Sequence, residues 1–492
     1  MSLIDIRNLS FTYEGGYTPV FENVSFRIDT DWKLGFVGRN GRGKTTFLNL
    51  LMDKYEYTGK IISDVAFTYF PFTVTDKTLT AQEILSNLCS SAEEWEILRE
   101  LSLLRVEADA YYRPFDSLSS GEQTKLLLAA LFLGEHGFLL IDEPTNHLDA
   151  EARRTVSQYL NKKKGFILVS HDRSFLDGCV DHILSINRTD IEICNGNFSS
   201  WHENFKRRQS FELSENERLQ RDISRLSAAA ARTAVWADRV EASKFGKTDA
   251  GLKPDRGYVG HKSAKMMKRA KSVQARQEKA AEQKSQLLKN VETEERLKLS
   301  PLAFRTERVA AFTDVCIYYD GKAVCGPLSF TLSRGDRLAL NGKNGCGKSS
   351  LLKIIAGEKI SHSGLVYLPS GLIVSYVPQT AAGLSGSLSQ FAAGHGIDES
   401  LFKAILNKMD FDKRLFDTDV SDYSEGQKKK VLIAKSLCES AHIYVWDEPL
   451  NFIDVYSRMQ IERLICEFNP TMIFVEHDKT FRDSVATATF DF

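Results

Sequence analysis

The sequence predicts two tandem α/β domains joined by a long α-helical hairpin. A set of five motifs occurs twice in the 492 residues, once towards each end of the chain. Within each copy, apolar strand-like runs such as 166–170 and 472–476 alternate with helical segments, which favours a largely parallel sheet. Between the copies, residues 201–300 lack these motifs and carry apolar residues at helical spacing. A chain of this length exceeds what one hydrophobic core usually supports, so more than one domain is expected.

The repeat sets the expected domain boundaries. We expect a first domain over residues 1–200, a helical linker over 201–300 and a second domain over 301–492. Within the linker, residues 244–262 contain several glycines and a proline, which indicate a loop at the tip of the hairpin.

The five repeated motifs keep one order and nearly one spacing. Each copy begins with a GxxxxGK[ST] motif between a strand-like run and a helical pattern. A serine in an LSSGEQ or YSEGQ segment, called the signature below, follows the motif lysine by 75 residues in the first copy and 76 in the second. An aspartate lies 23 residues beyond each serine. A glutamate follows each aspartate, and a histidine lies 28 or 29 residues further on. Agreement of this kind excludes coincidence. The repeated residues are Lys44, Ser119, Asp142, Glu143 and His171 in the first copy and Lys348, Ser424, Asp447, Glu448 and His477 in the second.

The glycine-rich motif predicts a phosphate-binding loop in each domain. Glycines allow a tight turn, so that backbone N–H groups and a helix N-terminus face the phosphates. The lysine reaches the β- and γ-phosphates, and the following hydroxyl residue serves Mg²⁺. The sequence therefore predicts two sites for nucleotide phosphates and Mg²⁺. The residues assigned to these loops are Gly38, Asn40, Gly41, Gly43, Lys44, Thr45 and Thr46, and Gly342, Asn344, Gly345, Gly347, Lys348, Ser349 and Ser350.

The Asp-Glu pairs at the ends of the apolar runs predict hydrolytic chemistry. Asp142 and Asp447 suit contact with Mg²⁺, and Glu143 and Glu448 suit polarisation of the attacking water. An exposed pair of turn carboxylates is the alternative, and the repeat disfavours it. The histidines that follow the next strands are candidates for contact with the γ-phosphate.

The two signature motifs predict a second cradle for phosphate. Ser119 with Gly121, and Ser424 with Gly426, precede helical runs, so each can present a helix start to an anion. A serine at this position would otherwise be an ordinary helix N-cap.

Together these motifs resemble those of ATP-binding-cassette (ABC) ATPases. The resemblance covers both copies and implies two tandem ABC-type P-loop ATPase domains that pair head-to-tail within one monomer. It implies that each ATP lies between the P-loop of one domain and the signature of the other. One site would combine the P-loop, Asp142, Glu143 and His171 of the first domain with Ser424 and Gly426. The other would combine the P-loop, Asp447, Glu448 and His477 of the second domain with Ser119 and Gly121. The resemblance also implies that Tyr13 and Tyr319 stack on adenine and that Gln379 approaches Mg²⁺.

Two departures from the family pattern make the sites unlike. The family glutamine is present as Gln379 in YVPQ, but the matching YFPF has Phe72. The sequence after the Asp-Glu-Pro triplet is NHLD in the first copy and NFID in the second. We expect ATP to bind at both sites and turnover to differ between them.

The linker is basic, although the whole chain carries a formal net charge of −1. Residues 206–276 contain 18 Lys and Arg against 8 Asp and Glu. Basic residues interleaved with aromatic ones suit contacts with phosphate and unstacked bases of RNA. A solvated spacer with a chance charge excess is the alternative. The tip residues assigned to this contact are Lys244, Phe245, Lys247, Lys253, Arg256 and Tyr258.

Two cassettes with a long charged linker resemble the ABC-F group of translation factors, and the long tip is similar to that of antibiotic-resistance members. The similarity is closest to the Lsa-type group that counters lincosamides, streptogramin A and pleuromutilins. It implies a ribosome-protection ATPase whose partners are the 70S ribosome, 23S rRNA and P-site tRNA. A housekeeping ABC-F factor and the ATPase half of an efflux pump are the alternatives.

The remaining composition favours a cytoplasmic protein without a membrane or DNA partner. The eight cysteines are scattered singly, which fits free thiols in a reducing compartment. The N-terminal residues lack the basic and apolar regions of a secretory signal, and the sequence lacks a run of about 18 apolar residues.

Overall fold

The computed structural model describes residues 2–15, 19–134, 137–146, 148–186, 191–242, 297–319 and 321–492, together with scattered positions between 257 and 279. The chain divides into two compact units. One unit comprises Met1–Ser199 and Glu294–Phe492, and the other comprises Ser200–Thr293. The first unit holds both copies of the repeat, which are the first and the second domain below.

The first domain is built on a six-stranded sheet in the order β5-β6-β7-β3-β8-β9. All neighbouring strands are parallel except β8 and β9, and β3 lies between β7 and β8. The carboxyl ends of β3 and β6 therefore meet at one edge of the sheet, where ligands bind in folds of this kind. A second, antiparallel sheet has the order β2-β1-β4. The strands are β1 (Leu3–Phe11), β2 (Phe21–Asp29), β3 (Lys33–Val37), β4 (Thr58–Ile62), β5 (Phe67–Phe70), β6 (Phe138–Asp142), β7 (Phe166–Val169), β8 (His182–Ile186) and β9 (Ile191–Asn195).

The helices of the first domain begin at residues that favour helix starts. Thr80 and Ser119 cap α2 and α4 through capping boxes. In each box the hydroxyl accepts a hydrogen bond from the backbone N–H of a glutamate, and the carboxylate of that glutamate accepts one from the backbone N–H of the capping residue. Phe47 in α1 packs against the buried Phe36 of β3. The helices are α1 (Lys44–Leu51), α2 (Ala81–Leu88), α3 (Glu94–Leu103), α4 (Ser120–Leu133), α5 (Ala150–Asn161) and α6 (Arg173–Cys179), with short 3-10 turns at Ala108–Tyr111 and Phe115–Ser117.

The second domain repeats this plan with a five-stranded parallel sheet. Its order is β14-β15-β16-β12-β17, beside an antiparallel sheet of order β11-β10-β13. The strand β15 is buried at every position, as expected for a parallel strand covered on both faces. The strands are β10 (Arg308–Tyr319), β11 (Lys322–Ser333), β12 (Arg337–Asn341), β13 (His362–Tyr367), β14 (Val374–Val377), β15 (Ile443–Asp447), β16 (Met472–Val475) and β17 (Ala488–Asp491).

The helices of the second domain follow the same order as those of the first. Ser387 and Ser424 form the capping boxes of α10 and α12. The helices are α9 (Lys348–Ile355), α10 (Leu388–Gly394), α11 (Glu399–Lys408), α12 (Glu425–Cys438), α13 (Val455–Phe468) and α14 (Lys479–Val485), with 3-10 turns at Lys413–Asp417 and Val420–Asp422. The predicted α/β class is confirmed for both domains.

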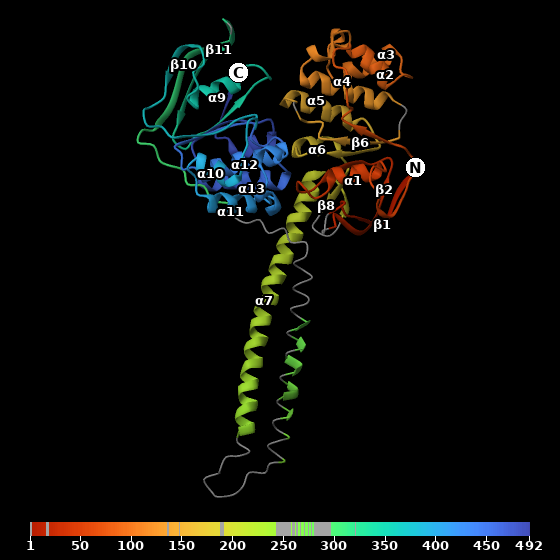
Figure 1. Ribbon diagram of the computed structural model, residues 1–492, viewed down its shortest axis with the longest axis vertical. Coiled ribbons are helices and arrows are strands. Elements are labelled where there is room, and N and C mark those ends of the chain that lie inside the picture. The colour runs from red at the N-terminus through yellow and green to blue at the C-terminus, as the bar shows by residue number, and fades with distance from the viewer. Residues whose placement is uncertain are drawn as a thin grey trace. The chain divides into compact units, whose positions relative to one another are not determined.

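A single helix, α7 (Phe198–Ala242), contains 45 residues and forms the first half of the predicted hairpin (Figure 1). It starts three residues before the linker boundary expected at residue 201. Phe198 is buried, and the backbone N–H of Ser199 donates to Asp177 Oδ1 at 2.7 Å. These contacts stabilise the additional residues at the N-terminus of the helix. In the part of the chain that the structure describes, no helix combines the length and the apolar character needed to span a membrane.

Candidate functional site

The first P-loop connects β3 to α1 and requires glycine at its last position. Gly43 has φ +92°, and a Cβ there would lie 2.5 Å from Val20 Cγ1 and 3.0 Å from the ring of Phe21. The buried Lys44 starts α1, and its Nζ donates to the carbonyl oxygens of Gly38 at 2.7 Å and Arg39 at 3.2 Å. Burial lowers the pKa of Lys44, so an anionic ligand beside it would stabilise its charge.

The second P-loop has the same construction between β12 and α9. Gly347 has φ +100°, and a Cβ there would approach Cys325 Sγ at 2.8 Å. Lys348 Nζ donates to the carbonyl oxygens of Gly342 at 2.7 Å and Lys343 at 2.8 Å. Each lysine side chain therefore lies across its own loop. The loop's backbone N–H groups and the start of the helix can bind phosphate there.

The carboxylates after β6 and β15 lie beside the P-loop hydroxyls. Thr45 Oγ1 donates to Asp142 Oδ2 at 3.1 Å, and Tyr69 donates to the same oxygen at 3.0 Å. Burial raises the pKa of Asp142, and it raises that of Asp447 to about 6. Neither carboxylate oxygen of Asp447 has an aligned hydrogen-bond donor among the described residues, although the Ser349 hydroxyl is near.

This donor set fits Mg²⁺. A buried carboxylate whose oxygens lack partners is costly unless a cation joins it, and Mg²⁺ prefers hydroxyl and carboxylate oxygens. Thr45 with Asp142, and Ser349 with Asp447, would hold the ion, which would neutralise negative charge on the phosphates during hydrolysis.

The glutamates that follow these aspartates are held differently. His171 Nε2 lies 3.4 Å from Glu143 Oε1, and burial raises the pKa of Glu143. His477 Nε2 lies 3.3 Å from Glu448 Oε1, and Asn451 Nδ2 donates to Glu448 Oε2 at 2.6 Å. Burial acts to raise the pKa of Glu448, but hydrogen bonds from these two groups and from a glutamine outweigh burial and lower it to about 2.

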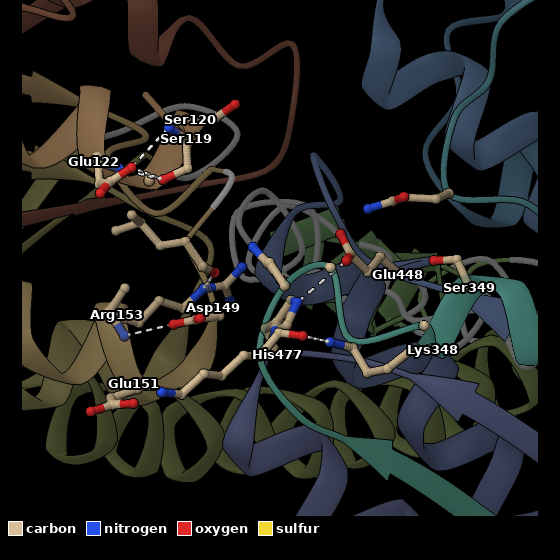
Figure 2. Close-up of a pocket in the computed structure, with 18 of the residues that line it drawn as sticks. Ser119, Ser120, Glu122, Asp149, Glu151, Arg153, Lys348, Ser349, Glu448 and His477 are labelled. Carbon is tan, nitrogen blue, oxygen red and sulfur yellow. Dashed lines mark hydrogen bonds and ion pairs between the residues drawn. The ribbon is translucent and has the colours of Figure 1, made fainter. Parts of the chain in front are cut away.

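Two cavities bring the predicted residues together in the crossed arrangement. The first cavity, of about 580 Å³, contains the first P-loop with Glu143 and His171, and the signature of the second domain. The second cavity, of about 990 Å³, contains the second P-loop with Glu448 and His477, and the signature of the first domain. Figure 2 shows the second cavity with Ser119 on one wall and Lys348 and Ser349 on the other. Either volume suits a nucleotide-sized ligand.

Nearly all of the predicted nucleotide residues line these cavities. In the first cavity they are Tyr13, Asn40, Gly41, Gly43, Lys44, Thr45, Thr46, Asp142, Glu143, His171, Ser424 and Gly426. In the second they are Ser119, Gly121, Tyr319, Asn344, Gly345, Gly347, Lys348, Ser349, Ser350, Gln379, Glu448 and His477. Gly38, Gly342 and Asp447 are not among the residues that line either cavity.

The signature serines act as helix N-caps and also line the cavities. Ser119 Oγ accepts from the backbone N–H of Glu122 at 3.3 Å and donates to its carboxylate at 2.7 Å (Figure 2). Ser424 Oγ accepts from the backbone N–H of Gln427 at 3.4 Å. Capping and phosphate contact are compatible, because a hydroxyl oxygen has two lone pairs and can also donate.

Each predicted adenine-stacking tyrosine is anchored to its own P-loop. Tyr13 OH lies 2.6 Å from Thr46 Oγ1, and Tyr319 OH lies 3.1 Å from Ser350 Oγ. Each ring is 46% exposed at the rim of its cavity. An anchored, half-exposed aromatic ring offers a flat face to a base.

Sequence reasoning missed the contacts that join the two domains at the first cavity. Asn40 Nδ2 donates to the carbonyl oxygen of Phe452 at 2.8 Å, and Arg42 and Arg39 lie 3.5 and 3.7 Å from Asp410 Oδ2. The change from NHLD to NFID marked the segment that contains Phe452. No sequence motif marks Asp410. The six predicted tip residues between 244 and 258 lie outside the described residues.

The chain matches the ABC transporter family over residues 21–146 and 325–451, which together cover just over half of it. It is 26% identical to the ribosome protection protein VmlR of Bacillus subtilis, over 99% of this chain and 86% of that protein. It is 25% identical to ABC transporter F family member 2 of Arabidopsis thaliana, over 97% of this chain and 74% of that protein.

Among solved structures, the archaeal ribosome recycling factor aABCE1, crystallised with the stalk protein aP1, has a TM-score of 0.63. The alignment covers 98% of this chain and 87% of that chain at 18% identity, a level that shows a shared fold alone. The chain belongs to the ABC transporter family, and it is an ATP hydrolase that uses ATP with Mg²⁺.

Proposed function

We propose that this chain is an ABC-F ATPase that binds the 70S ribosome and protects it from antibiotics of the peptidyl-transferase centre. ATP closes the two domains, and the hairpin that begins with α7 then enters the exit site, contacts 23S rRNA and displaces P-site tRNA. Drug leaves the remodelled pocket, and hydrolysis releases the factor. The observation that carries the proposal is the pair of crossed cavities in a chain that also contains a 45-residue helix.

We assign roles in ATP binding and hydrolysis to the repeated residues of the two cavities. Lys44 and Lys348 bind the β- and γ-phosphates, and the signature residues of the opposite domain close over the γ-phosphate. Glu143 and Glu448 polarise the attacking water, with the neighbouring histidines at the γ-phosphate. The oxygens assigned to Mg²⁺ are those of Thr45, Asp142, Ser349, Asp447 and Gln379.

The charge and the exposure of the linker support the proposed binding to the ribosome. Residues 206–276 carry ten more basic than acidic side chains. Arg218, Arg221 and Arg225 of α7 are between 72% and 79% exposed, and among the described residues each forms an ion pair with an acidic residue of the same helix. Exposed pairs of this kind are worth less than about 1 kcal/mol, so RNA phosphate can replace the acidic partner. The name of the Bacillus subtilis relative agrees with a ribosomal target.

Lincosamides, streptogramin A and pleuromutilins are the drug classes that we propose, on the resemblance to Lsa-type proteins. A housekeeping ABC-F translation factor is the second candidate. The plant relative, whose name gives F-family membership and no drug, aligns almost as well as the ribosome protection protein. Both candidates act in the cytoplasm as monomers.

Ribosome binding is tested with a variant that binds ATP but cannot hydrolyse it. The double variant Glu143→Gln/Glu448→Gln should co-sediment with 70S ribosomes in ATP. The matched control, Lys44→Ala/Lys348→Ala, removes phosphate binding and should stay in the supernatant. Absence of the glutamine variant from the ribosome pellet would refute the ribosomal target.

Drug protection is tested separately in cells. Expression of the wild-type chain should raise the inhibitory concentration of the three drug classes without lowering drug accumulation. Unchanged susceptibility would favour the housekeeping factor, and lowered accumulation would favour an efflux ATPase.

A further inference from the structure

The two glutamates beside the cavities start from nearly the same backbone geometry. Glu143 and Glu448 have φ of +48° and +45°, a conformation that side-chain-bearing residues seldom adopt. The backbone N–H of each donates to the end of the neighbouring strand, to Val169 O at 2.9 Å and Val475 O at 3.0 Å. Differences between the two carboxylates therefore arise from the side chains around them.

Both carboxylate oxygens of Glu448 have partners. Asn451 Nδ2 donates to Oε2 at 2.6 Å, His477 Nε2 lies 3.3 Å from Oε1, and Gln379 also hydrogen-bonds to the carboxylate. Asn451 and Gln379 line the second cavity together with Glu448. Contacts on both oxygens fix the rotation of the carboxylate plane, and three partners leave about one of its four lone-pair sites to a water molecule.

Glu143 has fewer contacts in the equivalent place. Its Oε1 is buried without a hydrogen-bond donor among the described residues, and His171 lies 3.4 Å away. Asn146 corresponds to Asn451, yet its bond to Glu143 is a long backbone one, from its N–H to the glutamate carbonyl oxygen at 3.4 Å. Phe72 stands at the position of Gln379, and its side chain has no amide group that could donate a hydrogen bond to Glu143.

We propose that Asn451 is a positioning residue for ATP hydrolysis, which holds Glu448 in the orientation that polarises water and makes the second cavity the site of faster turnover. A group that must take a proton from water contributes only when its lone pair points at that water, and small misalignments cost much of the rate. Asn451 contacts this carboxylate at 2.6 Å, against 3.3 Å for His477. The inference rests on the proposed role of Glu448.

The test compares Asn451→Ala with Asn146→Ala in the full-length chain, by steady-state hydrolysis and by single turnover of labelled ATP. Loss of alignment should lower kcat of Asn451→Ala roughly 10-fold. The KM for ATP should change less than twofold, because the carboxylate holds water rather than nucleotide. Asn146→Ala should stay within twofold of the wild type in both constants. Equal effects of the two alanine variants, or a rise in KM that accounts for the loss, would overturn the proposal.

A double-variant cycle separates positioning from a structural role. If Asn451 acts through Glu448, then Asn451→Ala should slow the wild type but add nothing in the Glu448→Gln background. An equal loss in both backgrounds would contradict the proposal. Fluorescent-nucleotide binding and the melting temperature check that each variant is folded. If Asn451→Ala fails to fold, Asn451→Ser, which keeps a shorter polar side chain, takes its place in the same measurements. A normal rate for Glu448→Gln alone would instead refute the proposed role of Glu448.

Discussion

Arg173 Nη2 lies 2.6 Å from Glu462 Oε2 and joins α6 of the first domain to α13 of the second. Both side chains are largely buried, at 10% and 19% exposure, so the pair is poorly screened by salt. Reversal of either charge places two like charges together. We expect Arg173→Glu and Glu462→Arg each to lower ATP hydrolysis several-fold, because both cavities need the two domains in contact.

The combined swap, Arg173→Glu with Glu462→Arg, tests whether the contact itself matters. It should recover most of the hydrolysis rate, since the attraction is restored with opposite polarity. A double variant slower than either single one would show that these side chains act through other neighbours.

Tyr69 and Tyr376 offer a matched pair of hydroxyl deletions. The hydroxyl of Tyr69 donates to Asp142, whereas that of Tyr376 is buried without a partner among the described residues. Tyr69→Phe should leave Asp142 with one donor fewer and weaken Mg²⁺-dependent ATP binding at the first cavity by a few-fold. Tyr376→Phe should be nearly neutral or slightly stabilising, because it removes an unsatisfied polar group. Isothermal titration with ATP and Mg²⁺, beside thermal melts, would measure both effects, and a larger loss for Tyr376→Phe would contradict the assignment.

Gly426 of the second signature faces the segment of Phe452 at close range. A Cβ at Gly426 would lie 2.7 Å from the carbonyl oxygen of Phe452, the oxygen that accepts from Asn40. Gly426→Ala should push this backbone away and lower hydrolysis by roughly an order of magnitude, with the fold retained. Gly394→Ala is the control, because a Cβ there meets no heavy atom within 4 Å. Normal activity of Gly426→Ala, measured by phosphate release, would exclude a tight contact at this point.

The buried carboxylate of Glu100 predicts a pH dependence of stability. Tyr159 and Lys163 donate to its Oε2 at 2.5 and 2.7 Å. Burial acts to raise its pKa, but these bonds and Arg99 outweigh burial and lower it. The stabilisation is therefore complete above the ordinary glutamate pKa of 4.5 and is lost as pH falls through the lower folded value.

Thermal melts of Glu100→Gln across the acid range would measure this contribution. The variant should melt several degrees below the wild type at pH 7, given that about 1 kcal/mol shifts the melting temperature of a domain of this size by about 2–4 °C. The difference should shrink below pH 4. A difference that stays constant through this range would show that packing, and not charge, is lost.

The sequence predicted the parts of the site that the backbone dictates. Gly43 is required by its positive φ and close packing, and Lys44 follows it at the start of a helix, so the motif fixes both positions. The partners of the carboxylates could not be predicted in the same way. Asn451 has a counterpart in Asn146, and only the folded side-chain contacts separate them. Asp410 lies 368 residues from Arg42, and no local pattern marks a contact over such a distance.

The length of α7 sets how far a small movement can be transmitted. At 1.5 Å per residue its 45 residues span about 68 Å, so a turn of roughly 5° at its first residues carries its last residues through about 6 Å. A displacement of that size exceeds the diameter of a water molecule and approaches the thickness of two stacked bases. A change of a few degrees in the direction of the first residues of α7 would therefore displace its last residues by several ångströms.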